Sequence, residues 1–175
     1  RLAADKLATA ERLAGSGLPV PRTTGAKTPE EAAGIGFPLV LKPRDGAGCV
    51  GLRLVTEADR LAEAWREAKA ESDGSALIAQ SRIPGEHASV SLVSDGRRAV
   101  VLSLNGQRIA EGKRFEYEGG VVPLDHPLRE RAQEVAVRAC SAVPGLCGYV
   151  GVDLVLGAEA TLIEINPRLT TAYVG

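Results

Sequence analysis

The sequence predicts an α+β fold, and three features of the chain support this prediction. Residues 149–156 and 161–165 are apolar segments separated by a short Gly-containing gap, which is typical of an antiparallel β-hairpin. Residues 87–94 and 99–104 flank an Asp-Gly turn signal in the same way. Apolar residues recur at helical spacing in three further segments, at 2–14, 56–70 and 127–143. The 175 residues are therefore expected to form one domain, or two small lobes that share one site.

Composition narrows the class of protein. Hydrophobic residues make up 45% of the chain but aromatic residues only 3%, so the core is expected to consist mainly of Ala, Val, Leu and Ile. The net charge is -1 and no block of like charge stands out, which argues against nucleic acid and membranes as partners. No apolar run approaches the roughly 20 residues of a transmembrane helix. Cys49, Cys140 and Cys147 have neither zinc-site nor disulfide spacing, so we expect buried free thiols and a reducing, cytoplasmic location.

The C-terminal hairpin contains two acidic residues within its apolar strands, Asp153 and Glu164. If the hairpin closes symmetrically, Leu156 faces Thr161. Asp153 then faces Glu164 on the same side of the sheet, with Cβ atoms about 5 Å apart. Asn166 lies two residues beyond Glu164 and shares that side. Opposed carboxylates repel one another unless a cation lies between them, and oxygen ligands of this kind suit Mg²⁺. The alternative is an ordinary hairpin with a hydrated polar face.

A Gly-rich segment joins two short predicted strands, 37–43 and 52–55. Lys42 lies near the end of the first strand, and the segment from Asp45 to Gly51 follows it with three glycines. The backbone N–H groups of such a loop are able to approach a polyphosphate. The loop is neither a Walker loop nor a Rossmann fingerprint, because a strand rather than a helix follows it. A flexible turn without function is the alternative.

Turn and capping signals divide the rest of the chain. Thr28 opens a short helix with a capping box, and Thr56 is expected to cap the helix at 56–70. Asn105-Gly106 is expected to be a second hairpin turn. Residues 107–120 are then expected to form an irregular, charged loop over the site, with a plain surface loop as the alternative.

The segment Gly151-Val-Asp153, followed by Glu164-Ile-Asn166-Pro-Arg168, resembles the metal-binding end of the ATP-grasp superfamily. The resemblance spans nearly the whole chain, because Asp5-Lys6-Leu7, Lys42 with the Gly-rich loop, and residues 80–85 follow in the family's order. It implies two lobes, about 18–81 and 83–175, each with an antiparallel sheet and helices, and ATP bound between them. Members usually carry a further N-terminal domain; the chain starts at Arg1 without it, so we expect a fragment of a longer protein.

The resemblance also implies roles for individual residues. The segment 80–85 is expected to be a hinge whose backbone reads the adenine edge. Phosphates, base and ribose would be bound by Lys6, Lys42, Asp45, Gly46, Ala47, Gly48, Gly51, Gln80, Ser81, Arg82 and Ile83, together with His87 or Glu86. The position relative to Ile83 favours His87 for the ribose. Mg²⁺, or Mn²⁺ in its place, would be held by Asp153, Glu164 and Asn166, while Lys42 and Arg168 act on the reacting acyl group.

The reaction implied by the resemblance joins an amino-acid carboxylate to an amine through an acyl phosphate and releases ADP and phosphate. The residues around Arg168 and the segment 117–123 resemble most the branch that includes tyramine–glutamate ligase of methanofuran-type cofactor synthesis. Small-molecule substrates would be contacted by Lys113, Arg114, Thr170, Thr171 and Tyr173. The alternatives are a nucleotide-binding module without catalysis and a kinase that phosphorylates a hydroxyl. The sequence leaves the oligomeric state open.

Overall fold

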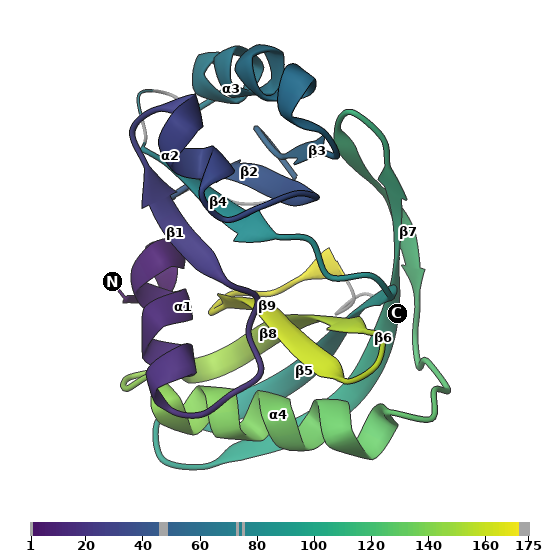
Figure 1. The fold of residues 1–175 in the computed structure, drawn as a ribbon. Helices are drawn as coiled ribbons and strands as arrows, with labels where there is room; N and C mark the ends of the chain where they lie inside the picture. The colour runs from purple at the N-terminus through teal and green to yellow at the C-terminus, as the bar shows by residue number, and fades with distance from the viewer. Residues whose placement is uncertain (1, 46–48, 73, 75, 172–175) are drawn as a thin grey trace.

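The computed structural model describes residues 2–45, 49–72, 74 and 76–171, and these residues form two lobes (Figure 1). The lobe 1 sheet is antiparallel with the order β1-β4-β2-β3. Its strands are β1 (Thr23–Ala26), β2 (Leu39–Pro43), β3 (Arg53–Val55) and β4 (Leu77–Ser81). The lobe 2 sheet is antiparallel with the order β7-β6-β5-β8-β9. Its strands are β5 (Glu86–Asp95), β6 (Ala99–Glu111), β7 (Phe115–Val121), β8 (Cys147–Leu156) and β9 (Ala160–Asn166). The α+β prediction is therefore confirmed.

The helices cover the outer faces of the two sheets. Helices α2 (Pro29–Ala33) and α3 (Leu61–Ala70) pack on lobe 1, and α4 (Arg129–Ala142) packs on lobe 2. Helix α1 (Lys6–Gly15) joins the lobe 2 core through Leu13, although it precedes lobe 1 in the chain. Both ends of the described chain thus contribute to lobe 2.

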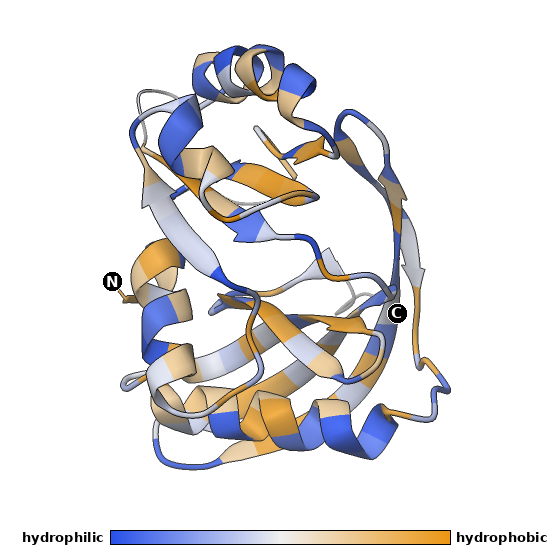
Figure 2. Ribbon diagram, viewed as in Figure 1, coloured by the Kyte–Doolittle hydropathy of each residue, from blue (hydrophilic) through white to orange (hydrophobic). Residues whose placement is uncertain are grey.

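Buried apolar side chains of the described residues form two separate clusters, one for each lobe. Leu39, Leu41 and Trp65 belong to the lobe 1 cluster, whereas Val90 and Val152 belong to the lobe 2 cluster. Figure 2 shows apolar stretches along the strands of both sheets, while α3 and α4 alternate polar and apolar residues as surface helices do. Each lobe thus has its own core, and the space between the lobes is left for a site.

Two helix predictions need correction. The predicted helix 2–14 is divided: residues Leu2–Ala4 form a 3₁₀ turn, and Asp5 then caps α1 by accepting a hydrogen bond from the Ala8 amide at 3.1 Å. Thr56 does not cap the helix at 56–70, because a 3₁₀ turn precedes α3 and no side chain caps it. The cap at Thr28 is confirmed, with the Glu31 amide 3.3 Å from its hydroxyl.

The predicted turn at Asn105-Gly106 is wrong, because β6 continues through it to Glu111. Asn105 is fully buried, and its side-chain amide donates to Ser91 Oγ at 2.9 Å across the sheet. The chain turns instead at 112–114, so the predicted irregular loop is largely the hairpin of β6 and β7. Tertiary hydrogen bonds thus overrode a strong local turn signal.

The register of β8 and β9 confirms that Asp153 pairs with Glu164, but not the symmetric turn that led to this prediction. Leu156 pairs with Ala160 rather than Thr161, so the connecting turn is one residue shorter. A β-bulge between Asp153 and Leu154 restores the pairing. Bulges re-aim side chains beside functional sites, and this one aligns the two carboxylates.

Two further expectations are tested by the structure. Cys140 is buried and Cys49 is half-buried, but Cys147 is exposed, so the expected burial of all three thiols is wrong. Among the helices of the described residues, none has the length and apolar character needed to cross a membrane.

Candidate functional site

A cavity of about 330 Å³ lies between the two lobes and is lined by strands of both sheets and by the segment that joins them. Many predicted site residues line it: Lys42, Gln80, Ser81, Arg82, Ile83, His87, Asp153, Glu164, Asn166, Arg168, Thr170 and Thr171. Gly46, Ala47, Gly48 and Tyr173 lie outside the described residues. Residues from distant parts of the sequence therefore meet at one cavity.

Lys6 and Asp45 lie beside the cavity rather than in its lining. Lys6 Nζ donates to the carbonyl oxygen of Asp45 at 3.0 Å and is 4.0 Å from Glu164 Oε1. Lys6 is also held through its backbone, because its amide donates to the Arg44 carbonyl at 2.9 Å. This lysine therefore links the start of the Gly-rich loop to a carboxylate of lobe 2.

The remaining predicted site residues among the described ones do not line the cavity. The Gly51 amide donates to Glu71 Oε2 at 3.2 Å. Glu86 is exposed, unlike His87, which lines the cavity. Lys113 and Arg114 lie at a separate surface depression beside Glu67 and Glu116.

One end of the cavity holds the two carboxylates predicted from the hairpin. Asp153 accepts hydrogen bonds from Gln107 Nε2 at 3.1 Å and from Asn166 Nδ2 at 2.8 Å. Desolvation and the neighbouring Glu164 raise the pKa of Asp153 to about 7, although these amides and Arg168 act in the opposite direction. A carboxylate pair held in this way is stabilised by a bound cation.

The donor set at this end suits a hard cation such as Mg²⁺. In the part of the chain that the structure describes, no three His, Cys, Asp or Glu side chains cluster closely enough to hold a metal ion. A cation between Asp153 and Glu164 would therefore need another oxygen, and Asn166 carries one in the side-chain amide whose nitrogen donates to Asp153. Two carboxylates and one amide oxygen are ligands that Mg²⁺ accepts, together with phosphate oxygens.

Lys42 faces this acidic end from lobe 1. Its Nζ donates to Gln80 Oε1 at 2.7 Å, and Gln80 Nε2 in turn donates to Thr23 Oγ1 at 2.9 Å. Burial lowers the pKa of Lys42 to about 8, with Lys6 adding to the effect and with Glu164 and Asp153 opposing it. The Gln80 side chain thus orients a buried lysine across the cavity from Glu164. The sequence predicts that Gln80 belongs to the hinge, but it does not predict this role for the Gln80 side chain.

The segment that joins the lobes is fixed by backbone contacts. The amides of Ser81 and Arg82 donate to the carbonyls of Arg22 at 2.9 Å and Pro38 at 3.1 Å, both in lobe 1. Gly85 has a φ of +151°, and a Cβ at this position would collide with the Leu156 backbone. The hinge therefore leaves lobe 1 in a fixed direction and passes close against the β8–β9 turn.

The middle of the cavity is apolar, and sequence reasoning missed much of it. Lobe 1 contributes Val40 and Leu52, the hinge contributes Ile83, and lobe 2 contributes Ile109, Phe115, Leu154 and Ile163. Phe115 is largely buried and lies edge-on to His87, with ring centroids 6.4 Å apart. An apolar slot between polar ends is the usual form of a site for a flat ring.

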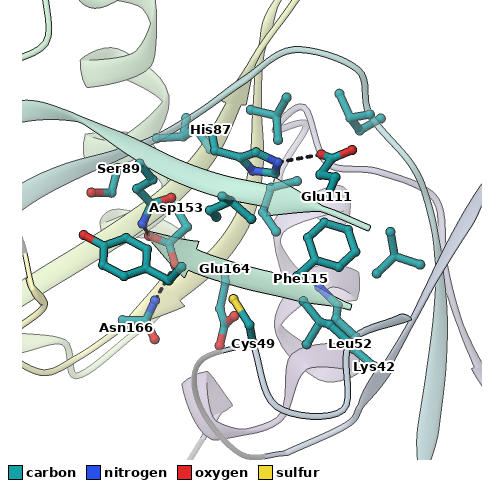
Figure 3. Close-up of a pocket in the computed structure, with 18 of the residues that line it drawn as sticks. Lys42, Cys49, Leu52, His87, Ser89, Glu111, Phe115, Asp153, Glu164 and Asn166 are labelled. Carbon is teal, nitrogen blue, oxygen red and sulfur yellow. Dashed lines mark hydrogen bonds and ion pairs between the residues drawn. The ribbon is translucent and has the colours of Figure 1, made fainter. Parts of the chain in front are cut away.

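Glu111 is the most prominent polar residue that sequence reasoning missed. Its Oε1 is 2.7 Å from His87 Nε2 (Figure 3). Its Oε2 accepts from Arg82 Nη2 at 2.6 Å. Burial alone would raise the pKa of Glu111, but the bonds from His87 and Arg82 hold it below its usual value. A signal was present in the sequence, because Gly112-Lys113 separates two strand-like segments, but the Asn105-Gly106 motif concealed it.

The segment after β9 folds back over the face of β8. A Cβ at Gly151 would collide with the Thr170 side chain, so a larger residue at this crossing would require Thr170 to shift. Tyr149 Oη is 3.0 Å from Thr170 Oγ1 and 2.6 Å from Ser91 Oγ, which fixes the segment to the sheet. Arg168 is thereby held at the acidic end of the cavity.

The sequence and the fold match known proteins. A family model described as the ATP-grasp domain matches residues 3–172. The chain belongs to the ATP-grasp family. An ATP-grasp superfamily protein from Archaeoglobus fulgidus superposes with a TM-score of 0.70 and 33% identity, over 97% of this chain and 47% of that protein. The two-lobed ATP-grasp arrangement expected from the sequence is therefore confirmed.

Ligases are among the ATP-grasp relatives. Tyramine–L-glutamate ligase of Methanocaldococcus fervens is 41% identical over 99 residues, which cover 57% of this chain and 33% of the relative. D-alanine–D-alanine ligase of Desulforudis audaxviator is 32% identical over 188 residues, covering 97% of this chain and 60% of the relative. The chain thus spans about a third of the first enzyme and somewhat less than two thirds of the second.

Proposed function

We propose that this ATP-grasp domain serves an ATP- and Mg²⁺-dependent ligase that joins an amino-acid carboxylate to an amine. One observation carries the proposal: a single cavity combines an apolar slot with Lys42, Asp153, Glu164, Asn166 and Arg168 at one end. A flat base fits the slot, and the charged end suits a polyphosphate with a cation. The names of the ligase relatives support C–N bond formation as the reaction.

In this proposal the nucleotide lies along the cavity. Ile83 and Phe115 contact the base, and the hinge from Gln80 to Arg82 borders its polar edge. His87, which lines the cavity, is better placed for the ribose than the exposed Glu86. Lys42, Lys6 and the Gly-rich loop from Asp45 to Gly51 contact the phosphates.

Asp153, Glu164 and Asn166 would hold Mg²⁺, and we propose that Mn²⁺ is able to replace it. The ion would supply charge neutralisation on the phosphate oxygens and would relieve the repulsion between the two carboxylates. The raised pKa of Asp153 supports this assignment, because burial beside Glu164 disfavours its charged form and a bound cation would offset that cost.

The reaction proceeds in two displacements. A carboxylate oxygen of the first substrate attacks the γ-phosphorus, the bond to the β–γ bridging oxygen breaks, and ADP leaves. The amine nitrogen of the second substrate then attacks the acyl carbon, phosphate leaves with the bonding electrons, and the nitrogen loses a proton. Lys42 and Arg168 offset negative charge at the transferring group, where fixed cations in a water-poor site are most effective.

The substrate class is an amino acid and an amine, with L-glutamate and tyramine as the first pair to test, because the name of the relative from M. fervens contains both. Thr170 and Thr171, which line the cavity next to Arg168, are placed to contact the acceptor. Tyr173 stays a candidate for the same contact, whereas Lys113 lies at the separate surface depression beside Glu67. The free thiols support the cytoplasm as the compartment.

The test is a product analysis with the full-length protein. With L-glutamate, tyramine and MgATP, we expect amide, ADP and phosphate in equal amounts. AMP with pyrophosphate, or a phosphorylated alcohol without amide, would exclude the ligase assignment. Nucleotide binding without any turnover over a panel of amino acids and amines would support a binding module instead.

A further inference from the structure

Glu71 lies at an unusual position for an acidic residue. It is the C-cap of α3, and Glu67 lies one turn before it. Negative charge at a helix C-terminus is disfavoured by the helix dipole. Arg53 compensates for both, because its Nε donates to Glu67 Oε2 at 2.8 Å and its Nη2 donates to Glu71 Oε1 at 2.7 Å. Arg53 is only 2% exposed, so this arrangement is built into lobe 1 and is not an incidental surface contact.

Glu71 also contacts two segments outside its own helix. Its Oε1 is 3.1 Å from Arg114 Nη2, and Arg114 belongs to the turn between β6 and β7 of lobe 2. Its Oε2 accepts the amide of Gly51, the last residue of the Gly-rich loop of lobe 1. The backbones of Arg53 and Arg114 form a β-bridge at the same place. Gly51, Arg53, Glu71 and Arg114 together are called the hairpin latch below, and Figure 1 shows the hairpin turn beside β3.

The hairpin that this latch holds carries one wall of the cavity. Ile109, Glu111 and Phe115 line the cavity from β6 and β7, and Phe115 directly follows Arg114. Glu111, in the last β6–β7 pair before the turn, is fastened to Arg82 of the hinge at 2.6 Å. The tip of the hairpin is therefore attached both to the hinge, through Glu111, and to lobe 1, through Arg114.

We propose that Glu71 is a positioning residue of the nucleotide site, which holds Arg114 and thereby keeps the β6–β7 hairpin closed over the apolar slot. The inference depends on the proposed function only in that the slot binds the base of ATP. It gives Arg114 a role other than contact with a substrate carboxylate, because its guanidinium is engaged by Glu71 outside the cavity lining. Loss of the contact between Glu71 and Arg114 is expected to loosen the wall that faces the base, and Arg114 itself is not among the proposed phosphate contacts.

Arg114→Ala is the preferred variant. Arg114 is 59% exposed, and its removal leaves the buried Arg53 paired with Glu67 and Glu71, so the fold is retained. Arg114→Lys keeps the charge and is the conservative variant. Arg131→Ala is the matched control, because it breaks an exposed ion pair with Glu134 on α4, which is 2.7 Å long and lies on the outer face of lobe 2.

The first measurement is hydrogen exchange of residues 109–121 without nucleotide. We expect exchange in Arg114→Ala to be about fivefold faster than in the wild type, as suits a partly exposed ion pair. Glu71→Gln should have a larger effect, since it also weakens the bond to the buried Arg53. Arg114→Lys should restore part of the protection, and Arg131→Ala should match the wild type. Unchanged hairpin exchange in both Arg114→Ala and Glu71→Gln would overturn the proposal.

The second measurement is calorimetry with MgATP and with adenosine. Because the wall contacts the base, Arg114→Ala should weaken both ligands by a similar factor of about five. A loss for MgATP alone would mean that Arg114 acts on the phosphates, and the latch proposal would be wrong. If the wild-type chain binds neither ligand, the proposed function fails, while the exchange result still decides whether the latch exists.

Discussion

Charged side chains have different kinds of partner at the two ends of the cavity. At the hairpin end, Glu111 is paired directly with Arg82 and lies within hydrogen-bond distance of His87. At the other end, Lys42 donates to the neutral amide of Gln80, and Asp153 accepts from the neutral amides of Gln107 and Asn166. The pKa of Lys42 is lowered and that of Asp153 is raised, so both charged forms are less stable there than in water.

This difference suggests that one end of the cavity mainly stabilises the fold, whereas the other end binds a charged ligand. Charges that neutralise one another hold elements in place, and a ligand gains little from them. Charged groups that are oriented by neutral amides remain available to bind a charged ligand. Perturbed pKa values of this kind are typical of functional sites. The comparison predicts that substitutions at the acidic end act mainly on binding and turnover, whereas those at the hairpin end act mainly on stability.

The largest effect is expected for Glu164→Gln. The change removes one of two carboxylates proposed to hold Mg²⁺, so turnover should fall at least about a hundredfold. Stability without metal should not fall, because the substitution also removes the repulsion on Asp153. Steady-state assays and urea unfolding measure the two quantities. Full Mg²⁺-dependent turnover in this variant would remove Glu164 from the metal site.

Lys42→Ala comes next and separates phosphate binding from base binding. Loss of a charge-assisted contact should weaken MgATP about 10- to 100-fold while leaving adenosine nearly unchanged. Calorimetry with both ligands measures the difference, with Lys27→Ala as the control for an exposed lysine on lobe 1. Equal losses for both ligands would contradict the assignment of Lys42 to the phosphates.

Glu111→Gln tests the hairpin end. It leaves Arg82 without its carboxylate partner, and we expect a stability loss of about 1 kcal/mol by urea unfolding. Binding of MgATP and adenosine should weaken together, and by less than MgATP weakens in Lys42→Ala. Should stability stay unchanged while only MgATP affinity falls, the division between the two ends would not hold.

The smallest expected effect is the pH dependence of the stability that Glu111 contributes. Bonds from His87 and Arg82 hold the pKa of Glu111 below its usual value, so the folded state binds this proton less readily than the unfolded state. The resulting stability is present above the usual glutamate pKa of about 4.5 and is lost as pH falls through the lowered value. The stability difference between wild type and Glu111→Gln should therefore shrink in unfolding curves below about pH 4. A constant difference down to pH 3 would contradict the pairing.

The sequence by itself determined much of the acidic end. Alternation along two neighbouring strands places Asp153, Glu164 and Asn166 on one side of the sheet, and a Lys-containing strand before a Gly-rich loop indicates the side that we propose for the phosphates. These are local relations of one or two residues, which the backbone geometry of a strand fixes. The order of the same motifs also sufficed to indicate the two-lobed fold.

Only the tertiary structure decided the hairpin end. The Asn105-Gly106 pair is a strong turn signal, yet Asn105 is buried in β6 by bonds to Ser91 and its neighbours across the sheet. That continuation of β6 brings Glu111 to Arg82 of the hinge, 29 positions away in the sequence. It also brings Arg114 to Glu71 of lobe 1, 43 positions away. The bulge between β8 and β9 that aligns Asp153 with Glu164 likewise follows from strand pairing as a whole. Such contacts depend on how separate elements pack against each other. Hydrophobic periodicity in the sequence reports the faces of single strands and helices, and it does not show which elements of the two lobes meet.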